Sequence, residues 1–344
     1  VAVDLPSGMN ADSGSTDGEF ARADATVTFT APKPCHVLGP NCDRLGKLRI
    51  GQIGSPGSLM SAVKLYLNDP ADFVEVLRAR DADSNKGRYG HVLVVGGAEG
   101  KSGAAEMTGV AALRAGAGLV TVASSVARLN TLELMTEGLP NSVAELERLT
   151  ERRNVIAIGP GLGTSAAAVA MVREMVVRRS VPMVLDADAL NALAGYDEWH
   201  APEAGSRILT PHPGEMARLT GVSVAEVQAD RLGVARRYAS AHACTVVLKG
   251  HRTVVALPDG RAWVNPTGSP SMATGGTGDI LTGMIAGLVA QQDSLASVLA
   301  AVWLHGRAGE IGAKHLGEQC LLATDLLTYL PEAMSDARNL ANRD

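Results

Sequence analysis

The pattern of hydrophobic and polar positions differs between two parts of the chain. From about Leu65 onward, short and fully apolar runs alternate with longer stretches of helical pattern. The apolar runs lie at 92–97, 118–123, 154–159, 181–188, 207–212 and 244–250, and the helical stretches include 103–117, 165–179, 223–241 and 277–290. Strands that are buried on both faces read as continuous apolar runs. The pattern therefore predicts an α/β fold with a mostly parallel sheet and helices on both of its faces.

The first 57 residues lack this alternation. Short β-like runs at 1–3, 25–30 and 47–50 stand between clusters of Gly, Pro, Asp and Ser, and no long amphipathic helix is predicted there. We expect a domain boundary within 58–85. The chain begins at Val1 in the middle of a β-like run, without Met or a signal peptide, so we expect it to be part of a longer protein.

Composition narrows the possible functions. Of 344 residues, 46% are apolar, 19% are charged and only 3% are aromatic, so the core is built from Ala, Val, Leu, Ile and Met. The net charge of -5, without a Lys/Arg block, argues against nucleic-acid binding, and no apolar run is long enough for a membrane span. The four cysteines, Cys35, Cys42, Cys244 and Cys320, are too scattered for a disulfide framework, which predicts reduced thiols in the cytoplasm.

Ligands of such folds bind at the carboxyl ends of the strands, where two glycine-rich loops stand in this sequence. "GGAEGKSGAAEMTG" (96–109) and "GPGLGTS" (159–165) each lead from a strand into a helix, but neither has Walker A or GxGxxG spacing. Each is interpreted either as an anion site at a helix start or as a tight turn. Two such loops at adjacent strand ends would suggest a shared cleft.

Polar residues follow other strands. Asp186 and Asp188 are two positions apart, a pattern that suits Mg²⁺ or substrate binding, although Asp188 is equally suited to cap the next helix. His212 stands between two prolines that fix its direction, with Glu215 three residues later. A binding role and a structural role both remain open for His212.

A hairpin is predicted over 246–256, with the basic residues Lys249, His251 and Arg252 at its tip. Such a tip can contact phosphate, although solvated charges on hairpins are common.

The glycine cluster of "GSPSMATGGTGDILTGMIAGL" (268–288) carries the most specific signal. Gly275, Gly276 and Gly278 let successive backbone N–H groups converge on one anion at the start of a helix. Asp279 then follows beside the anion site, where a carboxylate is unfavourable unless it has a task such as accepting a proton from an attacking hydroxyl. The structural alternative is an acid that merely favours the first helical turn.

"TGGTGD" resembles the Gly-Xaa-Gly-Asp anion hole of the ribokinase-like superfamily. Together with "GHVLVVGG", "SGAAEMTGVAALRAGAGLVTVA", "GPGLGT", "DADALN", "TPHPGEMARL" and "VVLKG", it makes about residues 75–335 similar to the ADP- or ATP-dependent NAD(P)H-hydrate dehydratases. The resemblance implies a ribokinase-like fold. It also implies a repair reaction, in which the C6 hydroxyl of hydrated NADH or NADPH (S epimer) is phosphorylated and phosphate is then eliminated.

The same resemblance implies roles for individual residues. Asp279 would be the base, and the anion hole would be Gly275, Gly276, Thr277 and Gly278. The hydrate would contact Ala104, Gly161, His212 and Asp279, and the nucleotide would contact Lys249, Gly250, His251, Arg252, Thr253 and Gly278. ADP or ATP is the expected phosphoryl donor, with Mg²⁺, and the bacterial type of fusion favours ADP. A homo-oligomer, a tetramer or higher, is a further implication.

Residues 1–57 resemble the C-terminal end of the NAD(P)H-hydrate epimerase domain through "VAVDLPSGMNADSG", "ARADATVTFTAPKP" and "GKLRIGQIG". We accordingly expect an epimerase remnant of Rossmann-like α/β type at 1–57, a linker at 58–74 and the dehydratase domain at 75–344. By this resemblance Asp4 would contact the hydrate and Ser7 would be a K⁺ ligand. The other K⁺ ligands and the earlier strands of that domain are absent, so we expect no working epimerase.

Two rival functions remain at this stage. The first is a vitamin or sugar kinase of the same superfamily, which needs Asp279 and the glycine hole equally. The second is a nucleotide-binding regulatory module without turnover, in which Asp279→Asn would leave every property unchanged.

Overall fold

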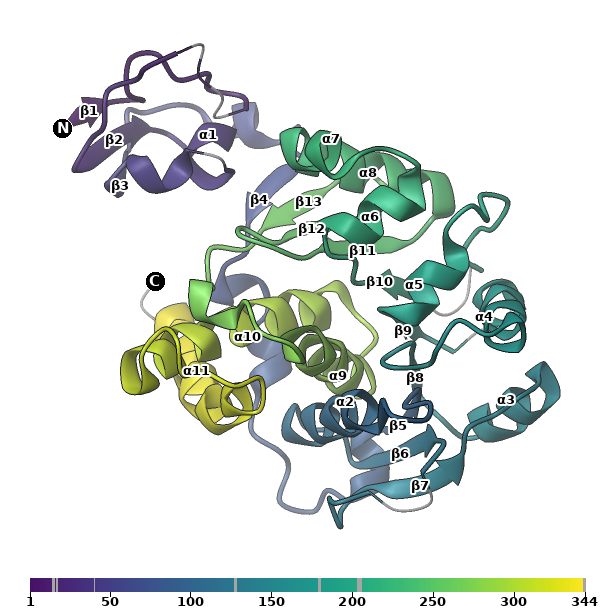
Figure 1. Cartoon of the computed structure of the whole chain (residues 1–344). Coiled ribbons are helices and arrows are strands. Elements are labelled where there is room, and N and C mark those ends of the chain that lie inside the picture. Colours follow the sequence, from purple (N-terminus) through teal and green to yellow (C-terminus); the bar gives the residue numbers. More distant parts are fainter. Residues whose placement is uncertain are drawn as a thin grey trace.

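The computed structural model describes residues 1–13, 16, 18–39, 41–126, 129–178, 181–202 and 206–342. Near the N-terminus, a small parallel sheet has the order β1-β2-β3 and stands apart from the rest of the strands (Figure 1). Its strands are β1 (Ala2–Val3), β2 (Ala25–Phe29) and β3 (Lys47–Gly51), with the short helix α1 (Pro34–Val37). The three β-like runs predicted in this segment are confirmed.

The larger sheet has the order β4-β13-β12-β11-β10-β9-β8-β5-β6-β7. Its strands are β4 (Leu65–Leu67), β5 (His91–Val95), β6 (Leu119–Ser124), β7 (Met135–Gly138), β8 (Val155–Ile158), β9 (Met183–Leu185), β10 (Arg207–Leu209), β11 (Thr245–Leu248), β12 (Val254–Ala256) and β13 (Ala262–Val264). Only the pairs β11–β12 and β12–β13 are antiparallel; the other pairs are parallel. The prediction of a mostly parallel sheet is confirmed, as is the hairpin over 246–256.

Helices cover both faces of this sheet and enclose two apolar cores. One face carries α2 (Ser102–Arg114), α9 (Thr277–Val289), α10 (Leu295–Leu316) and α11 (Asp325–Ala341). The other carries α3 (Val143–Thr150), α4 (Ala166–Arg178), α5 (Asp188–Leu193), α6 (Pro213–Thr220), α7 (Val224–Ala229) and α8 (Arg231–His242) (Figure 1). Within the described residues, no helix combines the length and the apolar character needed to cross a bilayer.

Two predicted helices differ in detail from the structure. The stretch 165–179 forms α4, but its predicted last residue, Arg179, lies outside the described residues. The stretch 223–241 is two helices, because Asp230 leaves the helical conformation (φ -139, ψ 59) and caps the second one. The Asp230 carboxylate accepts the backbone N–H of Gly233 at 2.9 Å. The Asp230 side chain thus accepts a backbone N–H group at the start of α8 that has no partner within the helix.

The predicted linker at 58–74 needs a correction, because part of it is built into the large sheet. β4 pairs in parallel with β13, and Tyr66 stacks on Trp263 with ring centroids 4.9 Å apart. The amide of Asn68 donates to Asn265 Oδ1 and to the backbone oxygen of Leu299, both at 3.0 Å. Phe73 is 1% exposed within the core on the α10 face. Residues 65–73 are therefore part of the larger unit rather than a linker.

Candidate active site

The helix α9 begins directly after the glycine cluster, as predicted. Gly276 has φ +95, and a Cβ there would lie 2.8 Å from Met107 Cε and 3.0 Å from Ala323 Cβ. At Gly278 a Cβ would lie 3.2 Å from the Nζ of Lys249. Gly276 is thus required by its backbone conformation and by the close approach of α2. Gly278 brings the first turn of α9 against the hairpin between β11 and β12.

Asp279 lies in that first turn, and its environment changes its acidity. Burial raises the pKa of its carboxyl group to about 7, with the nearby Asp186 and Glu215 acting in the same direction and Lys249 against it. Among the described residues, no side chain donates a hydrogen bond to the Asp279 carboxylate. A carboxylate with a pKa near neutrality and no protein partner is suited to accept a proton from a ligand.

Lys249 is the centre of the charged cluster beside Asp279. Its Nζ donates to Asp186 Oδ1 at 2.7 Å and lies 3.8 Å from Glu215 Oε2. Burial lowers the pKa of the Lys249 ammonium, but the two carboxylates outweigh this and its pKa lies above the ordinary value. The side chain of Lys249 is only 18% exposed. Lys249 is therefore a buried cation with protein partners, unlike the solvated residue that a hairpin tip suggests.

Asp186 and Asp188 serve different partners. Asp186 accepts from Lys249 and, through its second oxygen, from the Thr282 hydroxyl at 2.8 Å, which ties β9 to α9. Asp188 accepts the backbone N–H of Gly163 at 2.8 Å and so fixes the loop 159–165. Asp188 also stands inside the first turn of α5, whose N-cap is Ala187, so it does not cap this helix as predicted. Both aspartates thus have protein partners, and magnesium binding by the pair stays a prediction.

His212 has a capping role at the start of α6. Its Nδ1 accepts the backbone N–H groups of Gly214 at 3.0 Å and Glu215 at 3.4 Å, while Glu215 Oε2 accepts the N–H of His212 at 2.8 Å. This is a reciprocal capping box, with Pro213 at the first helical position. Because Nδ1 is an acceptor, a neutral ring carries its hydrogen on Nε2. The side chain is 51% exposed, and its Nε2 lies 3.5 Å from Glu215 Oε1.

The two glycine-rich loops lie against each other, since β5 and β8 are neighbours. Gly97 N–H donates to the oxygen of Pro160 at 2.9 Å, and Ala98 N–H donates to the oxygen of Gly161 at 2.7 Å. A Cβ at Gly161 would lie 3.5 Å from the Cβ of Ala104. The structure thus brings together Ala104 and Gly161, two of the residues predicted to contact the hydrate.

A cavity of about 810 Å³ opens beside the glycine cluster. The predicted nucleotide residues all line it, namely Lys249, Gly250, His251, Arg252, Thr253 and Gly278, together with Thr277 of the anion hole. Asp279 and the other predicted hydrate contacts, Ala104, Gly161, His212 and Asp4, are not in its lining. The sequence analysis did not find Thr282, the residue that holds Asp186, because its hydroxyl lies in an otherwise apolar helix.

The N-terminal candidates lie in the small sheet. Asp4 has φ +65, and its carboxylate accepts from the Thr28 hydroxyl at 2.8 Å and pairs with Lys33. The hydrogen bond from Lys33 is the main cause that lowers the pKa of Asp4. Ser7 is exposed, and its backbone oxygen accepts the N–H of Ala21 at 3.2 Å. A K⁺ site needs a shell of oxygens. Ser7 alone does not supply one, so no step is assigned to K⁺.

The fold defines a class of protein. The chain superposes with a TM-score of 0.73 and 36% identity on an ADP/ATP-dependent NAD(P)H-hydrate dehydratase from Bacillus subtilis, co-crystallised with ATP and Mg²⁺, covering 80% of this chain and 100% of that one. A ribokinase-like superfamily protein from Enterococcus faecalis V583 gives 0.69 and 31%, covering 80% and 96%. The larger unit therefore has a ribokinase-like fold, as expected.

Sequence comparison gives the family. Residues 92–332 match the model described as NAD(P)H-hydrate dehydratase, and residues 1–35 match the YjeF-related protein N-terminus. The chain is 45% identical to the bifunctional NAD(P)H-hydrate repair enzyme of Moorella thermoacetica and 38% identical to that of Escherichia coli, covering 99% and 100% of this chain and 67% of each relative. The chain belongs to the NAD(P)H-hydrate dehydratase family.

Proposed function

We propose that this chain restores hydrated NADH or NADPH, as the S epimer, with ADP as phosphoryl donor and ATP as the alternative. The observation that supports this most is the placement of Asp279. It is a partly buried carboxylate with a pKa of about 7, one residue after Gly278 at the start of α9. The N–H groups there suit a phosphate, and Asp279 suits the proton of the hydroxyl that attacks it.

The proposed reaction has two steps, phosphorylation and elimination. Asp279 accepts the proton of the C6 hydroxyl as its oxygen bonds to the terminal phosphorus of the nucleotide and the bond from that phosphorus to the leaving oxygen breaks. The bond from C6 to the phosphate oxygen then breaks with its electron pair on the phosphate, and the adjacent ring carbon loses a proton to water, which restores the ring double bond. Gly275, Gly276, Thr277 and Gly278 hold the transferred phosphoryl group through their N–H groups. Ala104, Gly161 and His212 contact the hydrate.

Magnesium would accompany the nucleotide, as it accompanies ATP in the crystals of the Bacillus subtilis relative. Asp186 is engaged by Lys249 and Thr282, and Glu310, which lines the cavity, accepts from Arg307 and from the N–H of Gly268. These contacts suit an ion held mainly by phosphate oxygens and water, which is usual for Mg²⁺ with nucleotides. When bound, it neutralises phosphate charge.

The test is direct. The protein is incubated with ADP, Mg²⁺ and hydrated NADH, and the absorbance of restored NADH is followed. Asp279→Asn should reduce turnover by orders of magnitude and keep nucleotide binding, whereas Asp325→Asn, a first-turn acid of α11, should behave as wild type. No gain in absorbance with wild type would favour the vitamin or sugar kinase or the regulatory module, and normal turnover by Asp279→Asn would show that Asp279 is not the base.

We further propose that residues 1–57 do not epimerise the hydrate by themselves, although Asp4 could contact it. Measurable interconversion of the two epimers would contradict this. A cytoplasmic homo-oligomer, a tetramer or higher, also remains our expectation. The cytoplasmic location, though not the assembly, is supported by Cys35, Cys42, Cys244 and Cys320, which are all free. Sedimentation of the purified protein tests the assembly.

A further inference from the structure

Asp43, a residue of the N-terminal segment, lies at the cavity of the larger unit. It belongs to a short 3₁₀ turn (Cys42–Arg44), and its side chain is 62% exposed. Asp43 is the member of this turn that lines the cavity beside the hairpin between β11 and β12. The segment before β4 therefore reaches the place proposed for the nucleotide.

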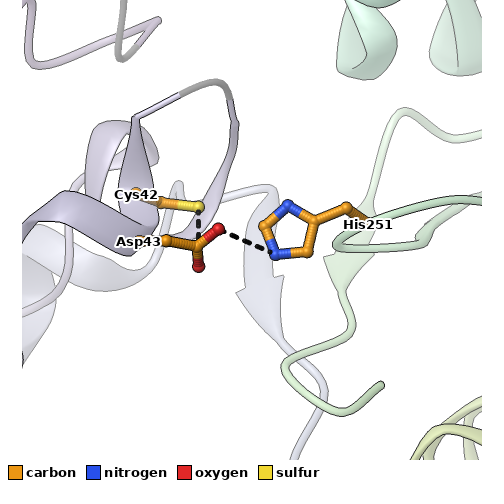
Figure 2. A group of neighbouring side chains, drawn as sticks. All are labelled: Cys42, Asp43 and His251. Carbon is orange, nitrogen blue, oxygen red and sulfur yellow. Dashed lines mark hydrogen bonds and ion pairs between the residues drawn. The ribbon is translucent and has the colours of Figure 1, made fainter. Parts of the chain in front are cut away.

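The carboxylate of Asp43 faces two basic side chains of that hairpin. Its Oδ2 lies 3.3 Å from His251 Nε2, as Figure 2 shows, and its Oδ1 lies 3.6 Å from Arg252 Nη2. Lys249, the third basic residue of the hairpin, is already paired with Asp186. Of the three basic residues of the hairpin, Arg252 and, when protonated, His251 are thus the ones available to bind a phosphate. Asp43 pairs with both of them.

The contact is fixed from both sides. Leu38, shortly before Asp43, is 9% exposed and packs in the core that also contains β11 and β12, and Cys42 is 5% exposed. On the hairpin, Arg252 has φ +57, and its Nη1 donates to the backbone oxygen of Pro266 at 3.1 Å. Packing before Asp43 and the hydrogen bond of Arg252 therefore keep the carboxylate and the guanidinium side by side.

We infer that Asp43 sets the nucleotide affinity of the cavity by pairing with His251 and Arg252, which a bound nucleotide must draw away from it. The inference rests on the proposed function, because it takes the cavity as the nucleotide site. A nucleoside diphosphate carries several negative charges, so the Asp43 carboxylate competes with it for the same cations. The N-terminal segment thereby weakens nucleotide binding in the larger unit.

A metal site is the rival interpretation of this cluster. One donor atom each from Cys42, Asp43 and His251 lies within 4.8 Å of the others, and sulfur, oxygen and nitrogen are donors that zinc accepts (Figure 2). The Arg252 guanidinium disfavours a second cation at Asp43. We therefore argue for the ion pairs and let the experiment address the metal.

Isothermal titration calorimetry of ADP with excess Mg²⁺ tests the inference on the full chain. Asp43→Asn should bind ADP about threefold more tightly at ~0.05 M salt, and the gain should shrink at ~0.5 M, as expected for two partly exposed ion pairs. Asp12→Asn removes the same charge from an exposed position of the same segment and should leave the affinity unchanged. In an Arg252→Gln background, Asp43→Asn should gain clearly less, because one released cation is missing.

Each failure points to a different cause. If wild type binds no ADP, the proposed nucleotide site is wrong, whatever Asp43 does. If wild type binds ADP but Asp43→Asn binds it equally or more weakly, the inference is wrong. It is also wrong if Asp43→Asn gains as much ADP affinity in the Arg252→Gln background as in wild type. The metal interpretation would replace it under two joint conditions. Wild type would bind one zinc ion that Cys42→Ser and Asp43→Asn both lose, and EDTA treatment of wild type would raise its ADP affinity as much as Asp43→Asn does.

Discussion

Lys249 Nζ lies 2.7 Å from Asp186 Oδ1, and the two charges act in opposite directions on the pKa of Asp279, which burial raises most. The Lys249 ammonium lies among the carboxylates of Asp186, Glu215 and Asp279. Lys249 is the basic residue that lowers the pKa of Asp279. Its charge opposes the rise of that pKa, whereas burial, Asp186 and Glu215 increase it.

The pH dependence of kcat/KM should show a rising limb. Since Asp279 must be deprotonated to act as base and its pKa is about 7, activity should increase with pH through about 7 and then level off. Lys249→Met removes the group that lowers this pKa, so the limb should move to higher pH. Lys64→Met, at the exposed side chain that donates to the oxygen of Asp259, is the control. An unchanged limb in Lys249→Met would disprove the proposed coupling.

Asp279→Asn should stabilise the protein at neutral and alkaline pH. The folded protein raises the pKa from 3.8 to about 7, so it disfavours the ionised form, and this cost to wild type grows as pH rises between those values. Asparagine has no such cost. The melting temperature of the variant should exceed that of wild type increasingly from about pH 4 to about pH 7, with a constant difference above. A difference independent of pH would contradict this.

Alanine substitutions at two neighbouring glycines should differ sharply in their effect on stability. Gly276→Ala forces a side chain into φ +95 and against Met107, so it should lower the free energy of unfolding by about 1–3 kcal/mol and disturb the anion hole. Gly275→Ala is the matched control, since a Cβ there meets nothing within 4 Å. Denaturant unfolding of both variants measures the contrast. Equal losses would show that the backbone at Gly276 is not the constraint.

His212 can be tested for its two roles separately. His212→Ala removes the cap and should cost about 1 kcal/mol of stability, whereas His212→Asn keeps an N-cap side chain and should cost much less. If the ring also contacts the hydrate, both variants should raise the KM for hydrated NADH. An unchanged KM in His212→Asn, the variant that keeps the cap, would leave His212 with the capping role alone.

The sequence predicted what depends on local pattern. The apolar runs gave the central strands, and the glycines before Asp279 gave the start of α9. It could not give the partners of these residues, because Lys249 and Asp186 are 63 positions apart and Thr282 and Asp186 are 96 apart. Which strand ends meet depends on the strand order. The sequence does not predict the pairing of β4 with β13 for a related reason, since β4 is only three residues long and Tyr66 pairs with Trp263, which is far away along the chain.

The place of β4 matters for anyone who divides this chain for expression. A fragment that begins at residue 75 would lack the strand that covers the outer edge of β13, the Tyr66 ring on Trp263 and the Asn68 amide at Asn265. Such an edge is a template for pairing between molecules, so this fragment should aggregate. A cut before Lys64 keeps β4 paired with β13, and removes Asp43 from the cavity at the same time.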